Sequence, residues 1–588
     1  MARGIAIVAA MPRRGGAVHV VTTRRRYKGR VYTTHLLRRS YRDQGQVKNE
    51  TLGNLSHLPD PLVDLIRRAL RGEPLLTADQ RFAVLRSLHH GHVLAVLTAM
   101  RQLGFASLLA SRASRERALV VGLVAARLLE PCSKLATSRW WHLTTLPEEL
   151  GVEDATEDDL YAALDWLLER QEAIEKKLAA RHLREGGFAL CDLSSSYFEG
   201  THCPLAARGH NRDGKRDKLQ VNYGLLADRR GRPVAVSVFP GNTNDPKTLL
   251  PQVEKLRERF GVQEVALVGD RGMLSQKQID ALRERPGMGW ITALRSEAIR
   301  GLLAGGSLQL GLFDERNLFE LYDPAYPGER LVACRNPELA RLRAHKRQAL
   351  LEATAKELEK VRGMVARGRL KGAAAIGVRV GKVVNKYKVA KHFHLDIRAG
   401  GFDYAIRQEQ VEAEAALDGI YVVRTSLPRE RLDAADTVRT YKRLSDVERA
   451  FRCLKTVDLK VRPLYHWSET RVRAHILLCM LAYYVEWHMI EAWRPLLFCD
   501  EDQEAKARRD PVAPAARSER ALEKVHGKRL PDGTVVHSFQ TLLQSLAGIV
   551  RNVCRAPGGG EAGPTFALET QRTPQQQRAY ALLEAIPV

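Results

Sequence analysis

The chain has 588 residues, 45% of them hydrophobic and 27% charged, with a formal net charge of +25 at pH 7. Because single hydrophobic cores stop growing at roughly 250–300 residues, this length predicts several domains of ordinary soluble composition. Eight cysteines without a CxxC pair argue against a disulfide framework and a zinc fold, and they suit a reducing compartment.

The positive charge is concentrated in two segments. Residues 1–50 hold twelve Lys or Arg against two acids, and residues 335–391 hold sixteen against four. A charge of this size and placement favours a polyanionic partner. The alternative is that these runs are solvated faces without a partner.

The first elements predicted along the chain are strands and then helices. Residues 17–55 alternate β-branched and basic residues and break at two glycine turns, which predicts a small antiparallel meander with a basic face. From Pro61 to about Leu183 the apolar spacing becomes helical, as in QRFAVLRSLHHGHVLAVLTAMRQLGFASLL, which indicates a helical domain.

A strand-rich region follows the helical domain. FALCDLSSSYF, LQVNYGLLAD and RPVAVSVFP predict three consecutive antiparallel strands. TLLPQVEKLRERFG predicts a helix, VALVGD a fourth strand, QKQIDALRER a second helix, and WITAL a fifth strand. The predicted order is therefore β-β-β-α-β-α, with one further strand after it.

Residues 301–418 interrupt this pattern with the strands LFELYD and ERLVACR, a basic helix and the strand HFHLDI. YVVRTS (421–426) then resumes the sheet, so we expect an insertion. Residues 437–458 predict a single helix, and the apolar segment 475–490 predicts a core helix and no membrane span, because His475, Glu486 and His488 interrupt it. The tail shows two short helical patches and a flexible break, APGGGEAGP.

These patterns predict six segments. They are a basic β-meander that binds DNA (1–57), a helical DNA-binding or linker domain (58–184), the first part of the core (185–300), a basic insertion (301–418), the second part of the core (419–495), and a linker with a helical C-terminal region (496–588).

Three carboxylates carry the predicted chemistry. Asp192 and Asp270 each end or interrupt an apolar strand, and Glu448 lies on the helix at 437–458. A carboxylate near a core needs a cation or metal ion beside it. Two aspartates and a glutamate can share two divalent ions, and oxygen ligands favour Mg²⁺, with Mn²⁺ as a substitute. The alternative for each acid alone is a capping or surface-paired carboxylate.

Taken together, these motifs resemble those of bacterial insertion-sequence DDE transposases of the insertion-sequence-four-like group. That group places its glutamate in a Tyr-x2-Arg-x3-Glu-x6-Lys helix, and Tyr441, Glu448 and Lys455 match the spacing. The residues after Asp192 and the VGDRGMLS segment around Asp270 resemble its first and second acid motifs. The resemblance implies an RNase H-like catalytic fold of the α/β class.

The resemblance also implies a function. The enzyme would cut at terminal inverted repeats with two metal ions and join the freed 3′-hydroxyl to target DNA. Its partners would be double-stranded transposon-end and target DNA and a second copy of the chain in a synaptic dimer, in the bacterial cytoplasm at the nucleoid. Two alternatives stay open: a metal nuclease of the same fold without joining activity, and a non-catalytic DNA-binding repressor or decayed copy.

Several cations and one tyrosine are candidate DNA contacts. The loop RGHNRDGKRDK lies between the first two strands and could hold phosphates, or could be a plain solvated loop. The candidates are Tyr441, Arg452, Lys455, Arg271, Arg212, Lys215, Arg216 and Lys218.

One position departs from the helix motif, because Leu444 stands where the group has arginine. Seven residues make nearly two helical turns, so Tyr441, Glu448 and Lys455 should share one stripe. Arg452 lies four residues after Glu448 on that stripe. We therefore expect Arg452 and Lys455 to supply the positive charge, and Arg443 to point away.

Overall fold

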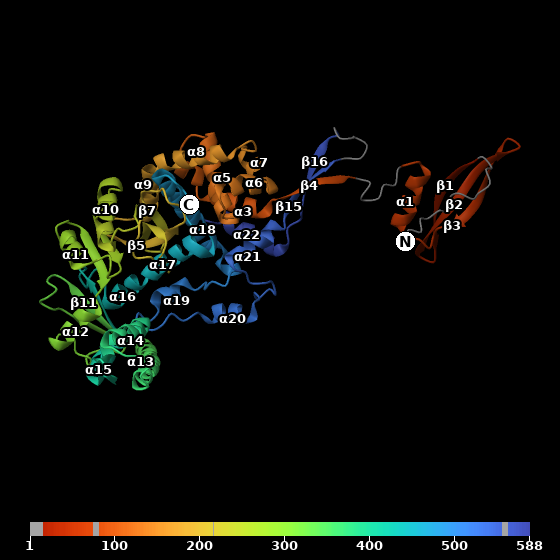
Figure 1. Ribbon diagram of the computed structural model, residues 1–588. Coiled ribbons are helices and arrows are strands. Elements are labelled where there is room, and N and C mark those ends of the chain that lie inside the picture. The colour runs from red at the N-terminus through yellow and green to blue at the C-terminus, as the bar shows by residue number, and fades with distance from the viewer. Residues whose placement is uncertain (1–15, 74–81, 216, 556–562, 588) are drawn as a thin grey trace. The chain divides into compact units, whose positions relative to one another are not determined.

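The computed structural model describes residues 16–73, 82–215, 217–555 and 563–587 (Figure 1). These residues form two compact units, one of residues 1–87 with 552–568, and one of residues 88–551 with 569–588. The segment Ala556–Pro564, predicted as a flexible break, lies largely outside the described residues.

The first unit begins with the predicted meander. Strands β1 (Ala17–Tyr27), β2 (Arg30–Asp43) and β3 (Gln46–Asn54) pair antiparallel in the order β1-β2-β3. The two connections, Lys28-Gly29 and Gln44-Gly45, have positive φ at both residues, as tight two-residue hairpins require. Helix α1 (Asp60–Leu70) follows and contacts β1. The meander and its turns are therefore confirmed.

A second small sheet corrects the predicted helical run at 80–109. Residues Ala83–His89 form strand β4, which pairs with β15 (Val550–Arg555) and, through it, with β16 (Thr565–Glu569). Helix α3 begins only at Gly91. Over so short a run, the apolar residues of β4 fit the spacing of a helix as well as that of a strand. Pairing with β15, more than 400 residues away, makes the segment a strand.

The second unit opens with helices, as predicted. They are α3 (Gly91–Gln102), α4 (Phe105–Leu109), α5 (Arg115–Leu129), α6 (Lys134–Trp140), α7 (Leu146–Leu150), α8 (Glu157–Glu169) and α9 (Gln171–His182). Side-chain caps fix several starts, including a Thr156–Asp159 capping box at α8. The buried helix α18 (Glu469–Trp493) packs against α5, α8 and β7.

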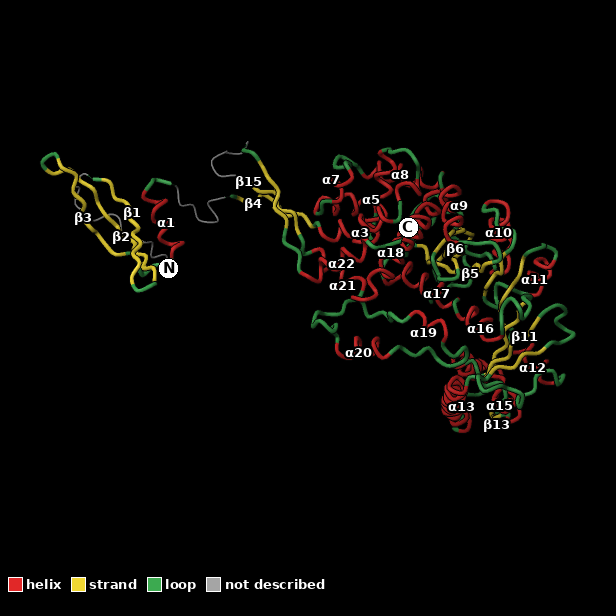
Figure 2. Tube along the Cα trace, turned by 180° about the vertical axis from the view of Figure 1, so that it is seen from behind, coloured by secondary structure: helices red, strands yellow, loops and turns green. Residues whose placement is uncertain are grey.

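An eight-stranded sheet forms the centre of this unit, in the order β10-β11-β14-β9-β8-β5-β6-β7. The strands β5 (Gly187–Phe198), β6 (Leu219–Asp228) and β7 (Pro233–Pro240) are antiparallel, as predicted. The strands β8 (Val265–Gly269) and β9 (Met288–Ala293) run parallel to β5. Figure 2 shows β5 and β6 flanked by helices α9, α17 and α18.

The helices between these strands also follow the predicted order. They are α10 (Leu249–Glu254), extended by a 3-10 turn (Asp245–Thr248) and a π turn (Lys255–Arg259), and then α11 (Gln276–Arg283). The helix α12 (Ser296–Ala304), which follows the fifth strand, was not predicted. The β-β-β-α-β-α order and the fifth strand are confirmed.

Two strands assigned to the insertion belong to this sheet instead. β10 (Leu318–Leu321) pairs with β11 (Arg330–Arg335), and β11 pairs with β14 (Ile420–Thr425), which in turn pairs with β9. The sequence showed two short strands, but strand partners depend on contacts distant in the chain. The predicted start of the insertion at residue 301 is therefore too early, because β10 and β11 still belong to the central sheet.

The elements between β11 and β14 have their own apolar cluster. These are α13 (Pro337–Ala366), α14 (Ala373–Tyr387), β12 (Phe393–Ile397), β13 (Phe402–Ile406) and α15 (Gln408–Ala415). Leu358, Ile376 and Phe393 are among its buried residues. Figure 1 shows α13, α14 and α15 grouped together.

The single helix predicted at 437–458 is three pieces. Helix α16 (Ala434–Lys442) ends at Arg443, α17 spans Leu444–Arg452, and a π turn covers Cys453–Val457. The argument that Tyr441, Glu448 and Lys455 share one continuous α-helical stripe is therefore wrong, because the helix break and the π turn each change the rotation per residue.

The tail contains more structure than the two helical patches predicted. It forms α19 (Gln503–Arg508), α20 (Glu519–Gly527), α21 (Phe539–Ala547) and α22 (Pro574–Glu584), besides β15 and β16. Each helix is short, so its apolar spacing is a weak signal, and packing against α3 and α18 stabilises α21 and α22.

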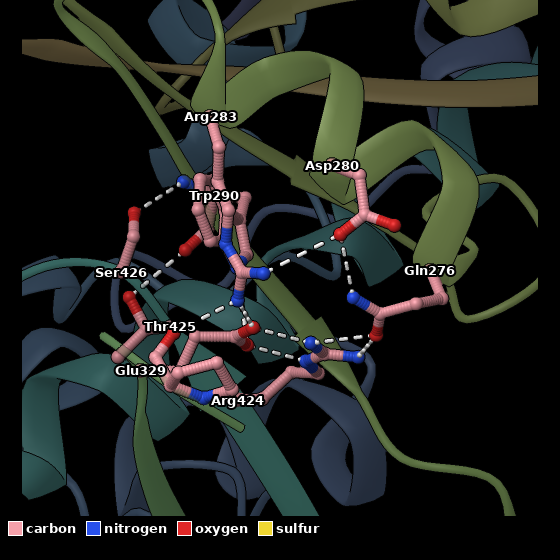
Figure 3. Close-up of polar contacts among 9 residues, drawn as sticks. Gln276, Asp280, Arg283, Trp290, Glu329, Arg424, Thr425 and Ser426 are labelled. Atoms are coloured by element: carbon pink, nitrogen blue, oxygen red, sulfur yellow. Dashed lines mark hydrogen bonds and ion pairs between the residues drawn. The ribbon is translucent and has the colours of Figure 1, made fainter. Parts of the chain in front are cut away.

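A buried ion network holds the edge of the central sheet (Figure 3). Glu329, fully buried before β11, accepts hydrogen bonds from Arg424 on β14 and from Arg283 on α11. The indole of Trp290 also donates to Glu329 at 3.3 Å. One carboxylate thus connects α11, β9, β11 and β14.

We expect Glu329→Ala to destabilise the protein by about 3 kcal/mol, because it leaves two arginines without their shared carboxylate. Asp280→Ala is the matched control, since Asp280 also contacts Arg283 but is exposed, and such a pair contributes at most about 1 kcal/mol. Thermal unfolding of both variants measures the difference. Equal melting temperatures would contradict the structural role of Glu329.

Candidate active site

Two aspartates meet because β5 and β8 are parallel neighbours. Their register pairs Gly187 with Val265 and Cys191 with Gly269. The next residue on each strand is Asp192 and Asp270, so the two carboxylates follow adjacent positions at the same side of the sheet. Consecutive strands in the sequence do not show this, because β6 and β7 intervene between them.

The turn after β8 fixes the carboxylate of Asp270. Its Oδ1 accepts hydrogen bonds from the backbone N–H groups of Gly272 (3.1 Å) and Met273 (2.8 Å). A Cβ atom at Gly272 would lie 3.2 Å from Oδ2 of Asp270 and 3.6 Å from Oδ2 of Asp245. Glycine at this position therefore lets the backbone approach two carboxylates.

Helix α17 brings the third acid to the same place. Its buried residues Leu444, Val447, Ala450 and Phe451 pack toward β5, with Phe451 against Tyr223 at 5.7 Å between ring centroids. Glu448 is exposed and lies next to Leu444 and Phe451 on the helix surface, four residues after the one and three before the other. Burial of the apolar face of α17 thus brings the Glu448 carboxylate to the margin of that face.

The three acids line one cavity of about 540 Å³. The rest of its wall comes from β5, from the loop after it and from the helices α16 and α17. The other lining residues are Leu193, Ser194, Arg212, Tyr441, Lys442, Leu444, Ser445, Phe451, Arg452 and Lys455. The three predicted acids and four of the eight candidate contacts therefore meet in one cavity.

The environment of Asp192 disfavours the charged form of its carboxyl group. Burial, together with the negative charges of Asp270 and Glu448, raises its pKa from 3.8 to about 7, while the Leu193 N–H and Arg212 act in the other direction. The Leu193 N–H donates to Asp192 at 2.8 Å. Among the described residues, no cation lies within ion-pair distance of Asp192, Asp270 or Glu448. In the described chain, none of the three carboxylates therefore has an ion-pair partner of its own, although Arg212, Arg452 and Lys455 line the same cavity.

Tyr441 shares this environment. Burial and the carboxylates of Asp270, Glu448 and Asp192 raise the pKa of its hydroxyl to about 12, against the effect of Arg271. The phenol stays protonated at neutral pH and can donate a hydrogen bond into the cavity.

The donor set fits divalent cations. Three carboxylates with no counterion supply hard oxygen ligands, as Mg²⁺ and Mn²⁺ prefer. Oxygens of the three acids do not all lie within 4.8 Å of one another.

In the described chain, one cluster of three potential ligands does have its atoms within 4.8 Å of one another, but it is buried away from solvent. Cys453, Asp458 and Glu486 are buried behind α17. Burial, with the neighbouring carboxylate of Asp458, raises the pKa of Glu486 well above its usual value. These residues do not line the cavity of Asp192.

Lys455 lines the cavity but is already paired. Its Nζ donates to Asp213 at 3.0 Å, and Arg462 forms a second ion pair with the same carboxylate. Asp213 is 2% exposed and also accepts the Tyr197 N–H at 3.0 Å. Lys455 therefore fixes the loop after β5 against the π turn that follows α17.

The remaining candidate contacts divide into two groups. Arg212 lines the cavity, where Asp245 holds it at 2.7 Å, and Arg452 is exposed on the cavity wall. Arg271 and Lys215 are exposed outside this lining. Lys218 pairs with Glu199 at 2.8 Å, and Arg216 lies outside the described residues.

Two functional residues escaped the sequence analysis, Asp213 and Asp245. Asp213 stands within the loop RGHNRDGKRDK, whose cations alone were considered. Asp245 follows the N-cap residue Asn244 at the start of the 3-10 turn before α10, and its carboxylate binds Arg212. Nothing in the local sequence distinguishes these acids from surface acids.

Family models match two parts of the chain. Residues 200–485 match a model described as a transposase DDE domain, and residues 20–79 match the N-terminal domain of the IS1634 family of transposases. The chain is an insertion-sequence DDE transposase. A comparison with curated proteins gave no significant match.

These matches agree with the resemblance in class and refine the group. The DDE match implies an RNase H-like core within the mixed α/β fold of the transposase, and it includes Asp270 and Glu448. It begins eight residues after Asp192, so the position of Asp192 beside the other two acids comes from the strand register and the shared cavity. The N-terminal match names the IS1634 family and gives no support to the insertion-sequence-four-like group.

The family also bears on partners. Transposases of this class act on DNA and generally use divalent metal ions. No helix in the described part of the transposase is long and apolar enough to cross a membrane.

Asp192→Asn should stabilise the metal-free transposase at pH 8 by about 1–3 kcal/mol, because it removes a buried charge without changing shape. A carboxyl with a raised folded-state pKa stabilises fully below about 3.8 and loses that contribution as pH rises through about 7. The gain should therefore grow from pH 5 to pH 8. Thermal unfolding in chelator measures it, with the exposed Asp217→Asn as control.

A gain that is independent of pH would contradict the raised pKa of Asp192. A loss of stability in Asp192→Asn at pH 8 would show that the ionised carboxylate has a stabilising partner in the folded protein.

Proposed function

We propose that the transposase cleaves DNA at the terminal inverted repeats of its element and joins the freed 3′-hydroxyl to target DNA. In cleavage, water attacks the scissile phosphorus and the 3′ oxygen leaves. In joining, that 3′-hydroxyl attacks a phosphorus of the target strand. The observation that carries this proposal is the meeting of Asp192, Asp270 and Glu448 in one cavity without a counterion.

In this proposal Asp192, Asp270 and Glu448 hold two Mg²⁺ ions, which Mn²⁺ can replace. Bound there, the ions would stabilise the charge on the attacking and leaving oxygens. The raised pKa of Asp192 supports this role, because a buried carboxylate without an ion-pair partner is stabilised strongly when a cation binds beside it.

The surrounding residues would position the DNA. Arg452 and Arg212 line the cavity and would bind phosphates next to the scissile bond. The protonated Tyr441 would donate to a phosphate oxygen, and the buried Leu444 closes the wall between them. Lys455, tied to Asp213, would act mainly by holding the loop that carries Arg212. Arg271, Lys215, Arg216 and Lys218 would contact DNA farther from the scissile bond.

The basic segments would hold the rest of the substrate. Arg24, Arg25 and Arg26 are exposed on β1 of the meander, and Arg341, Arg343 and Lys346 are exposed on α13. Exposed rows of this kind suit phosphate contacts and strong salt dependence. We propose that residues 1–57 and the elements α13 to α15 between β11 and β14 bind DNA, together with the core that holds the central sheet.

Assembly and classification complete the proposal. Two element ends must be handled together, so we propose a homodimer in the synaptic complex. The Tyr441, Glu448 and Lys455 spacing, with all three residues in one cavity, supports a likeness to the insertion-sequence-four-like group in this part of the chain.

A nuclease without the joining step is the second candidate function. The same cavity would serve it, and the exposed basic rows on β1 and α13 favour a longer DNA contact than cutting alone requires. Incubation of a pre-cut end with target DNA and Mg²⁺ separates them, since only the transposase reaction gives joined product. A gel shift without any product would favour the repressor.

Asp192→Asn, Asp270→Asn and Glu448→Gln should each lower cleavage at least 100-fold, because each removes a metal ligand. Binding to end DNA should change less than threefold. Asp436→Asn is the control, since its carboxylate on α16 is half exposed and, within the described part of the chain, forms an ion pair with Arg439 alone. Full activity in excess chelator, or cleavage by all three variants, would contradict the metal site.

Arg452→Ala should weaken end binding or cleavage by about tenfold, more than Arg443→Ala does, because one charged phosphate contact contributes about 1–2 kcal/mol. Arg452 lines the cavity, whereas the Arg443 guanidinium donates to the Arg229 carbonyl at 3.3 Å. Gel shift and cleavage rates measure both. A larger defect in Arg443→Ala would show that DNA approaches α17 from the other side.

A further inference from the structure

A second cavity of about 1100 Å³ lies between the helical segment and the loop that precedes α18. Its walls come from α5, from the start of α6, from α8 and from residues 460–471. The charged residues of its lining are Arg127, Lys134, Asp165, Glu169, Lys460, Arg462 and Arg471, and its aromatic ones are Tyr161, Tyr465, His466, Trp467 and His475.

The cavity has more cations than anions, and most of its cations lack an acid. Five lysines and arginines face two carboxylates in the lining. Among the described residues, only Arg462 of these five has a carboxylate partner. Lys134 is 3% exposed, and no hydrogen bond or ion pair of its ammonium group is found in the described chain. Burial, with Arg127 nearby, lowers the pKa of this amine to about 7, so its charged form is favoured only when an anionic ligand lies beside it.

Neutral groups hold the other cations in place. Arg127 is buried and donates to the carbonyls of Cys132 at 3.0 Å and Leu459 at 3.5 Å. Arg471 lies over the ring of Tyr161 at 4.4 Å from the centroid. Carbonyls and rings position a guanidinium without neutralising it, so these cations stay available to a ligand.

Aromatic rings line the same cavity and are exposed. Tyr465 is 63% exposed and Trp467 is 72% exposed. Large exposed aromatic rings beside positive charge are typical of sites that stack nucleic-acid bases. A nucleotide has a phosphate, which cations bind, and a base, on which aromatic rings stack. This cavity offers both kinds of group.

The cavity is linked to the acidic site through two contacts. The end of β5 holds the loop, since the Glu199 N–H donates to the Leu464 carbonyl at 3.0 Å and the Leu464 N–H to the Tyr197 carbonyl at 3.3 Å. Arg462 of this cavity and Lys455 of the acidic cavity share the carboxylate of Asp213. The walls of the two cavities are therefore joined through the end of β5 and through Asp213.

We propose that this cavity binds an unpaired nucleotide of the DNA strand that enters the active site, with Lys134, Arg127 and Arg471 on its phosphate and Trp467 and Tyr465 stacked on its base. This inference deepens the proposed function and rests on it. It assigns to the helical segment a direct contact with single-stranded DNA beside the reaction.

Photocrosslinking of the full-length chain tests the proposal. The probe is a short single-stranded oligonucleotide with one 5-iodouracil, and peptide mapping locates the crosslink. We expect it within residues 461–471, and we expect Trp467→Ala and Lys134→Met each to lower its yield about tenfold, the effect of one lost stacking or phosphate contact. Lys277→Met, an exposed lysine on α11 outside this cavity, should leave the yield unchanged.

Each outcome decides the proposal. A crosslink confined to other peptides, or one that survives both Trp467→Ala and Lys134→Met, overturns it. If Lys134→Met lowers the crosslink yield and Trp467→Ala does not, the cavity binds an anion without stacking a base, and the nucleotide assignment is overturned. Trp467 is exposed, so its replacement does not depend on refolding of a core.

The test is independent of the proposed chemistry. Asp192→Asn should abolish cleavage and keep the crosslink, because Asp192 does not line this cavity. Retained cleavage in Asp192→Asn would overturn the proposed function whatever the crosslink shows. A missing crosslink with normal cleavage would overturn only the nucleotide site.

Discussion

The site of this transposase depends on one pairing, the parallel register of β5 and β8. That register places Asp192 and Asp270 at adjacent positions of neighbouring strands, so two like charges are held close together in a partly buried place. Burial, together with this repulsion, raises the pKa of Asp192 and costs stability. The buried strands on both sides of β5 and β8 provide the packing that offsets this cost.

Most of the surrounding structure keeps that pair in register with its partners. The Glu329 network ties helix α11 to strands β9 and β14, and these two strands continue the sheet on the β8 side. On the β5 side, Asp213 connects the loop after the strand with Lys455 and Arg462. Burial of the apolar face of α17 then presents Glu448. Buried ion pairs gain little stability but demand a defined geometry, which a metal site requires.

Leu444 shows how the chain redistributes a function. An arginine at this position would give the cavity a cation from α17, and the leucine packs into the wall instead. Arg212 brings a cation into the same cavity from the loop after β5, held by Asp245. Arg452 brings another from the end of α17. The positive charge of the site thus comes from different positions on the chain.

The sequence by itself determined the local features. The glycine turns of the meander, the β-β-β-α-β-α order and the three acids follow from periodicity, turn residues and charges within a few positions of one another. Tertiary structure decided what depends on distant partners. β4 is a strand only because β15 pairs with it, β11 joins the sheet only through β14, and Asp213 becomes a buried ion-pair centre only when Lys455 and Arg462 meet it. Local sequence carries no information on such partners, because their pairing energy arises only when segments far apart in the chain come together.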